Sequence, residues 1–190
     1  MSRSAVLLLL VLSVGLGSFG PALAGESKAD EARQKIREAA QATLAQLYKS
    51  QPRAKAAIEK AAGYAVFNNF GMKILVAGGG SGKGLAVDNK TGKETFMKMV
   101  EVQAGLGFGA KKFSVVWVFE TPKSLATFVD SGWELGGQAS AAAKAGSTGS
   151  SFQGALSVSP GIWLYQLTET GLALELTAKG TKYFKDSDLN

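Results

Sequence analysis

This chain is predicted to adopt an α+β fold, in which N-terminal helices pack on a strongly curved, glycine-rich antiparallel β-sheet or barrel. Amphipathic helical patterns occupy residues 26–50 and 53–62. After residue 63 the hydrophobic period changes from 3.6 to 2, and a run of short strand patterns follows. Helices first and strands afterwards indicate an α+β fold rather than an alternating parallel one.

Glycines inside the predicted strands favour the strong curvature. Gly105, Gly107 and Gly109 fall on one face of a single strand pattern, and Leu106 and Phe108 fall on the other. Glycine within a strand usually marks a tight bend or the close approach of another backbone. A curved or barrel-like sheet is therefore the economical interpretation.

Residues 1–24 have the pattern of a secretory signal peptide. Arg3 precedes an apolar run over residues 5–16, and Ala22-Leu23-Ala24 offers small residues at a peptidase site. The apolar run is short of the roughly 20 residues that a spanning helix needs. We therefore predict cleavage between Ala24 and Gly25, and a periplasmic or secreted protein. Since residue 25 is not cysteine, it is not expected to be a lipoprotein, and any membrane association would be peripheral.

Composition narrows the classes of function. Removal of 24 of the 190 residues leaves one domain over residues 25–190, and loss of Arg3 lowers the net charge from +6 to +5. Such an excess suits an anionic lipid surface, whereas nucleic acid would require a clustered basic face. The chain has neither cysteine nor histidine, so it lacks thiol catalysis, the commonest general base and the commonest metal ligand. We predict no enzyme activity, no cofactor, no metal and no nucleic-acid partner.

The remaining elements follow from turn residues and alternation. Helical structure is expected over residues 25–62 and mainly β-structure over 63–190, with a short helix near 122–130 that Thr121 caps and Pro122 begins. Asn89-Lys90-Thr91-Gly92 is typical of a hairpin turn. The tail from residue 180 onward is polar except for Tyr183, Phe184 and Leu189. Strands are predicted at residues 64–70, 73–78, 84–88, 94–100, 101–110, 113–119, part of 133–144, 152–158, 162–168 and 172–178.

The glycine-rich segment at residues 78–84 does not form a nucleotide-binding loop. A Walker motif would require glycine where Ala77 stands and serine or threonine where Gly84 stands. We expect a bend between two strands instead, whose free amides, together with Lys83, could still accept a phosphate head group.

Basic side chains are the candidate binding residues. The N-terminal helices carry most of them, and their lysines and arginines could meet anionic head groups, or simply lie solvated outside an apolar stripe that packs on the sheet. The candidate lipid-binding residues are Lys28, Arg33, Lys35, Arg37, Lys49, Arg53, Lys55, Lys60, Lys83, Lys111 and Lys112.

Seven segments after residue 60 form a recognisable set of motifs. They are Ala62-Gly63-Tyr64-Ala65-Val66-Phe67, Gly82-Lys83-Gly84-Leu85-Ala86-Val87, Gly105-Leu106-Gly107-Phe108-Gly109, Phe119-Glu120-Thr121-Pro122, Ser131-Gly132-Trp133-Glu134, the run at residues 165–174 and the run at residues 180–186. These segments resemble the SYLF domain, a lipid-binding family related to a fungal actin-patch regulator. Together they cover most of residues 60–190, and the later ones are similar to the bacterial exported branch.

The resemblance implies a non-enzymatic phospholipid-binding protein of the bacterial cell envelope. Eukaryotic members bind phosphoinositides and, in fungi, actin filaments; their Trp-Ser pair is replaced here by Lys93-Glu94-Thr95-Phe96, and export would separate this chain from actin. Actin is therefore not an expected partner, and anionic phospholipid surfaces are. The alternatives are an envelope structural or protein-interaction module, and a barrel that carries an acyl chain internally.

Overall fold

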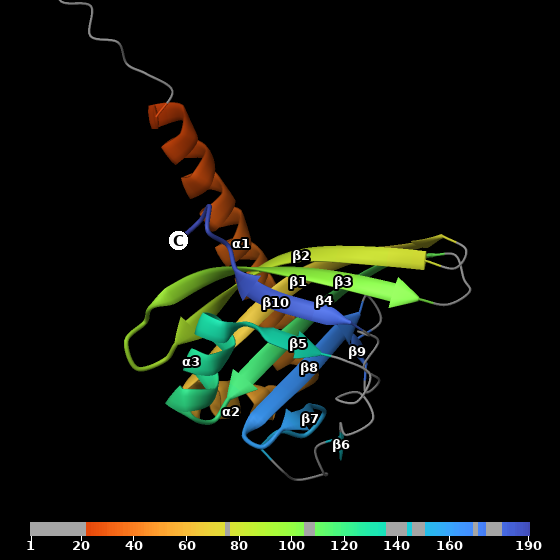
Figure 1. The fold of residues 1–190 in the computed structure, drawn as a ribbon. Helices are drawn as coiled ribbons and strands as arrows, with labels where there is room; N and C mark the ends of the chain where they lie inside the picture. The colour runs from red at the N-terminus through yellow and green to blue at the C-terminus, as the bar shows by residue number, and fades with distance from the viewer. Residues whose placement is uncertain are drawn as a thin grey trace, which may run out of the picture.

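The fold consists of helices packed on both faces of one strongly curled antiparallel sheet (Figure 1). The computed structural model describes residues 22–74, 77–104, 109–135, 144–145, 151–168, 171–173 and 180–190. The helices are α1 (Ala22–Ser50), α2 (Pro52–Lys60) and α3 (Pro122–Ser131). The strands are β1 (Gly63–Ile74), β2 (Ala77–Asp88), β3 (Glu94–Ala104), β4 (Gly109–Phe119), β5 (Trp133–Leu135), β6 (Lys144–Ala145), β7 (Leu156–Ser159), β8 (Ile162–Thr168), β9 (Gly171–Ala173) and β10 (Thr181–Lys185).

All described strand pairs are antiparallel, and the strand order is β5-β10-β3-β2-β1-β4-β8-β7-β6, with β9 paired to β8. This architecture confirms the predicted α+β class and the curved antiparallel sheet.

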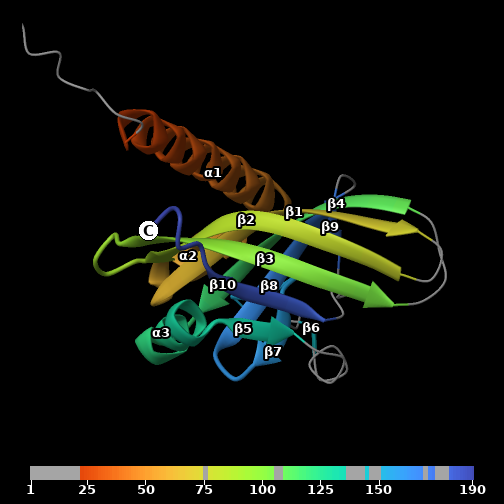
Figure 2. The ribbon, with the colours of Figure 1, turned by 45° about the horizontal axis from the view of Figure 1, so that its top comes forward.

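The two faces of the sheet have separate cores. Figure 2 shows α1 on one side of the sheet and α3 on the other, and we call these the outer and inner faces. On the outer face, Ile36 and Leu47 of α1 and Ile58 of α2 pack on Val66, Val116 and Tyr165 of the strands. On the inner face, Leu125 and Phe128 of α3 pack on Phe67, Trp117 and Tyr183. Alternate residues of each strand thus enter opposite cores.

The amphipathic stripe of α1 contacts the sheet as predicted. Ile36, Ala40 and Leu47 are buried, and Ala32 and Leu44 pack partly against the same core. Their three- and four-residue spacing places them on one side of the helix. Pro52 begins α2, which ends at Lys60.

Gly63 does not end the second helix, as the sequence suggested, but opens β1. Its missing side chain lets the Val87 carbonyl oxygen and the Leu125 side chain approach, which a Cβ atom would obstruct. Helix α2 is instead closed by the Ala61 amide, which donates to the Ala57 carbonyl oxygen.

The glycine segment at residues 78–84 is part of a strand rather than a bend between strands. Strand β1 runs unbroken from Gly63 to Ile74, where two strands were predicted, and β2 pairs with β1 and β3 along nearly its whole length. Ladder hydrogen bonds on both sides keep this glycine-rich backbone extended. The predicted strands at 94–100 and 101–110 likewise resolve into β3, which continues to Ala104, and β4, which begins at Gly109. Residues 105–108 lie outside the described residues.

Residues 181–185 form β10, which the sequence analysis missed. This strand lies between β3 and β5 and buries Thr181 and Tyr183 on alternate positions. Strand β7 begins at Leu156 rather than residue 152, and β8 matches its prediction at both ends. Most of residues 133–144 and 174–178, for which strands were also predicted, lie outside the described residues.

The predicted cap of α3 is confirmed and carries a stability prediction. Thr121 Oγ1 accepts a hydrogen bond from the Ser124 amide at 3.2 Å, and Pro122 occupies the first helical position. Thr121→Ala is expected to lower the free energy of unfolding by about 1 kcal/mol, because an N-terminal amide loses its acceptor. Thr121→Ser retains the hydroxyl and should remain near wild type in urea unfolding. Equal stability of the alanine and serine variants would show that the cap contributes nothing.

Candidate functional site

The candidate site is a groove on the outer face, beside the C-terminal half of α1. Two rows of side chains cross the strands there, and the groove has a volume of about 690 Å³. We call it the lysine groove. One row, in register from β10 to β8, is Phe184, Lys98, Lys83, Asn68, Ser114 and Leu167. The second row includes Val100, Ser81 and Lys112, and Gln46 and Thr168 also line the groove.

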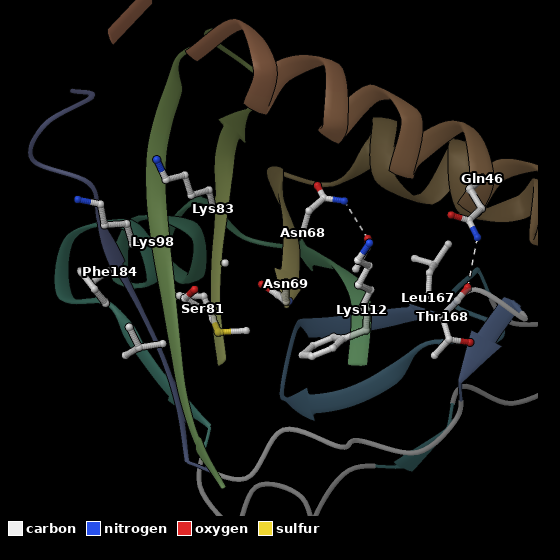
Figure 3. A pocket seen from close by; sticks show the side chains of 15 residues that line it. Gln46, Asn68, Asn69, Ser81, Lys83, Lys98, Lys112, Leu167, Thr168 and Phe184 are labelled. Atoms are coloured by element: carbon white, nitrogen blue, oxygen red, sulfur yellow. Dashed lines mark hydrogen bonds between the residues drawn. The ribbon is translucent and has the colours of Figure 1, made fainter. Parts of the chain in front are cut away.

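Helix α1 is tied to the groove by polar contacts (Figure 3). The Asn68 amide donates to Thr43 Oγ1 of α1 and to Ser114 Oγ of β4, both at 2.9 Å. Gln46 Nε2 donates to the Thr168 carbonyl oxygen at 3.4 Å. These contacts fix the edge of the groove where the helix crosses the sheet, so its polar side is held in place.

The floor of the groove is backbone. Asn69, Gly82, Met99 and Phe113 also line it, yet alternation directs their side chains to the inner face. Met99 and Phe113 indeed belong to the inner core. Asn69 is only 5% exposed, and its amide lies over Gly82 in the space that a Cβ atom would occupy. As lined by the described residues, the groove is therefore a shallow surface site.

Three lysines give the groove its charge, and they are not equivalent. Lys98 Nζ lies 2.7 Å from Asp186 Oδ1 and 2.8 Å from Asp188 Oδ2. The hydrogen bond to Asp186 raises the pKa of Lys98, and the hydrogen bond to Lys98 lowers the pKa of Asp188. Within the part of the chain that the structure describes, neither Lys83 nor Lys112 has an ion pair. These two exposed ammonium groups are thus available to an anion.

Two predicted site residues, Arg33 and Arg37, make contacts within the fold. Arg33 Nε donates to the Leu189 carbonyl oxygen at 2.9 Å, and Arg37 Nε lies 2.7 Å from Glu94 Oε2. The Arg37 guanidinium also lies over the Phe96 ring, 5.1 Å from its centroid. Both arginines join α1 to β3 and the C-terminal residues.

The other predicted basic residues are dispersed. Lys35 pairs with Glu31 at 2.6 Å and Lys55 lies 4.0 Å from Glu59, both within one turn of helix. The structure does not bring the helical lysines together with Lys83 and Lys112, and the side chain of Lys111 lies outside the described part. The remaining candidates are exposed on α1 and α2: Lys28, Lys49, Arg53 and Lys60.

Lys98, Asn68 and Ser114 are groove residues that the sequence analysis missed. A hairpin turn at residues 89–92 pairs Asp88 with Lys93 and, counting outward, Lys83 with Lys98. The predicted hairpin therefore contained the signal for Lys98. Nothing comparable pointed to Asn68 or Ser114, because β4 pairs with β1 across a separation of 46 residues.

The described residues offer two further observations about function. Among them there is no group of three or more acidic side chains placed to hold a metal ion. Within the same ranges, no helix combines the length and apolar character required to cross a bilayer.

Comparison with known proteins identifies the family. Residues 100–190 match the Ysc84 family model, described as "Las17-binding protein actin regulator". Beta cell expansion factor A of Aeromonas veronii is 35% identical over 163 residues, which cover 85% of this chain and 60% of that relative. The match therefore spans less than two thirds of that protein's length. The earlier resemblance is confirmed: this chain carries a Ysc84/SYLF family domain over residues 100–190.

Proposed function

We propose that this protein is a non-enzymatic phospholipid-binding protein of a bacterial cell envelope, and that the lysine groove contacts anionic membrane surfaces. The observation that carries the proposal is the placement of Lys83 and Lys112 in an open groove without ion pairs among the described residues. Ser81, Ser114 and Gln46 supply hydroxyl and amide groups beside them. A phosphate with its ester oxygens is an anion that such a set of donors suits.

The energetics favour a peripheral, reversible association. Each lysine near an anionic leaflet contributes about 1 kcal/mol, and this attraction decays within a Debye length. The net charge of +6, or +5 after removal of the predicted leader with Arg3, adds long-range attraction. The protein would therefore bind anionic membranes at low ionic strength and leave them as salt is added.

The inner face supports surface binding over an internal acyl chain. Phe67, Trp117 and Phe128 are fully buried there and pack on one another. Side chains occupy the described part of the concave space next to α3, so a lipid tail would have to displace them. The family description concerns Las17 and actin, and we do not extend it to this chain, because its predicted export would place it outside the cytoplasm.

Vesicle sedimentation with matched double variants tests the proposal. Lys83→Gln/Lys112→Gln should weaken binding to phosphatidylglycerol-containing vesicles by about thirtyfold at low salt, because two contacts of about 1 kcal/mol each are lost. Lys55→Gln/Lys60→Gln removes the same charge from α2 and should have a much smaller effect.

Equal losses in the two double variants would show that charge alone, and not the groove, binds the membrane. Absence of sedimentation of monodisperse wild-type protein at low salt would overturn the proposal. Retention of a specific envelope protein under those conditions would instead favour the alternative of a protein-interaction module.

A further inference from the structure

Two carboxylates lie beside the lysine groove, next to Lys98. Lys98 Nζ pairs with both Asp186 and Asp188. The Asp186 side chain is 1% exposed, whereas that of Asp188 is 78% exposed. The hydrogen bond to Lys98 lowers the pKa of Asp188, and the charge of Lys83 lowers it further. Asp188 therefore presents an ionised carboxylate to solvent at the edge of the groove.

The free cations of the groove lie close to these carboxylates. Lys83 lies directly across from Lys98 in the β2–β3 register, and Lys112 lies two strands further on, on β4. Neighbouring strands are about 4.8 Å apart, so one to a few strand spacings separate Lys83 and Lys112 from the carboxylates beside Lys98. The groove and its edge thus offer both signs of charge, rather than a uniformly basic surface.

From this charge arrangement we infer that the groove selects a phosphodiester that carries a primary amine. Its phosphate lies at Lys83 and Lys112, and its ammonium group donates to Asp188. This inference rests on the proposed function and names the head group. A two-carbon bridge between phosphate and amine, as in ethanolamine, has the scale of one strand spacing.

The two aspartates have different roles in this arrangement. Asp186 Oδ1 is shared by Lys98 Nζ and the Asp188 amide, and the Asp186 amide donates to the Phe96 carbonyl oxygen. Asp186 therefore holds the C-terminal residues on β3. Asp188 uses one carboxylate oxygen for Lys98, and its exposure leaves the carboxylate accessible to a second ammonium group. Asn190 binds both the amide and the carbonyl of Phe96, which keeps Asp188 beside the groove.

Two soluble head groups test the inference without a bilayer. Glycerophosphoethanolamine and glycerophosphocholine have the same charges, but the quaternary ammonium of the latter has no hydrogen to donate. In NMR titrations of the mature chain, we expect glycerophosphoethanolamine to bind about threefold more tightly, the effect of one exposed ion pair. Asp188→Asn should abolish this preference, and Lys83→Gln/Lys112→Gln should weaken both compounds.

A matched control separates the position of the charge from its amount. Asp130 is an exposed partner of Lys185 at 2.8 Å, on α3 and outside the groove. Asp130→Asn changes the net charge as Asp188→Asn does and should leave the preference intact. Circular dichroism verifies that both variants fold, as expected from the exposure of each aspartate.

Vesicles distinguish the lipid from the free head group. At fixed phosphatidylglycerol content, the wild type should bind vesicles completed with phosphatidylethanolamine more tightly than those completed with phosphatidylcholine, and Asp188→Asn should remove the difference.

Three outcomes would overturn the inference. A preference for ethanolamine in vesicles but not in solution would assign that preference to bilayer packing. Equal tightening of both soluble compounds by Asp188→Asn would make Asp188 only a competing acid and would also overturn it. Failure of glycerophosphoethanolamine to bind would overturn it as well. Vesicle binding that depends on Lys83 and Lys112 but ignores the amine would leave the proposed function standing alone.

Discussion

Replacement of Trp117 with alanine is expected to lower the free energy of unfolding by about 3–5 kcal/mol. Trp117 is fully buried at the centre of the inner core. Its ring centroid lies 5.2 Å from that of Phe128 on α3 and 5.1 Å from that of Tyr183 on β10. The truncation therefore opens a cavity where β4, α3 and β10 meet. Since domains are stable by only about 5–15 kcal/mol, urea unfolding followed by far-UV circular dichroism would show a large shift in midpoint.

Trp163 provides the matched control for this core prediction. It is partly buried on the outer side and stacks on Phe152 with ring centroids 4.6 Å apart. Trp163→Ala should cost only about 1–2 kcal/mol, because part of its surface already meets water. If the two tryptophan variants lost the same stability, the inner face would not be the better-packed core.

Gly84→Ala is expected to destabilise the protein by about 3 kcal/mol, the upper range for overpacking. A Cβ atom at Gly84 would overlap the Val66 carbonyl oxygen and lie 2.6 Å from a Phe67 ring carbon. The carbonyl belongs to the backbone of the neighbouring strand and cannot turn aside. The sheet would have to shift at the β1–β2 ladder to accommodate a single methyl group.

Gly79, on the same strand, makes this prediction specific. Its nearest neighbour would be the Glu101 carbonyl oxygen at 3.5 Å, an ordinary contact distance. Gly79→Ala should be neutral or stabilise by up to about 1 kcal/mol, because alanine loses less backbone entropy in a strand. Similar unfolding midpoints for the two alanine variants would contradict the close β1–β2 approach at Gly84.

Local sequence signals were reliable where neighbouring residues decide the structure. The alternation of side chains along residues 162–168 predicted both ends of β8. Thr121 and Pro122 predicted the start of α3. The turn at residues 89–92 predicted the β2–β3 hairpin, whose observed register pairs Lys83 with Lys98. In each case the interactions join residues only a few positions apart, so the local sequence pattern is enough to predict them.

Long-range pairing explains what the sequence analysis missed. Strand β10 is only five residues long and two of them are lysines, so its pattern resembles a polar tail. It becomes a strand because β3 and β5 supply hydrogen-bonding partners on both sides. Arg33 and Arg37, two of the predicted lipid-binding residues, contact Leu189 and Glu94, which lie far along the chain. Such contacts leave no periodic signal around either partner.

The sequence by itself determined the α+β class, the amphipathic helices, the main hairpin and the basic character of the surface, because each depends on composition or on short-range periodicity. Only the tertiary structure decided which lysines lie together. Cross-strand register places Lys83, Lys98 and Lys112 on one face beside α1, and the C-terminal residues bring Asp186 and Asp188 into contact with Lys98 at the edge of the groove. The physical reason is that a sheet joins residues by hydrogen-bond register, which depends on every strand between them. The lysine groove therefore exists in the fold and in no single segment of the chain.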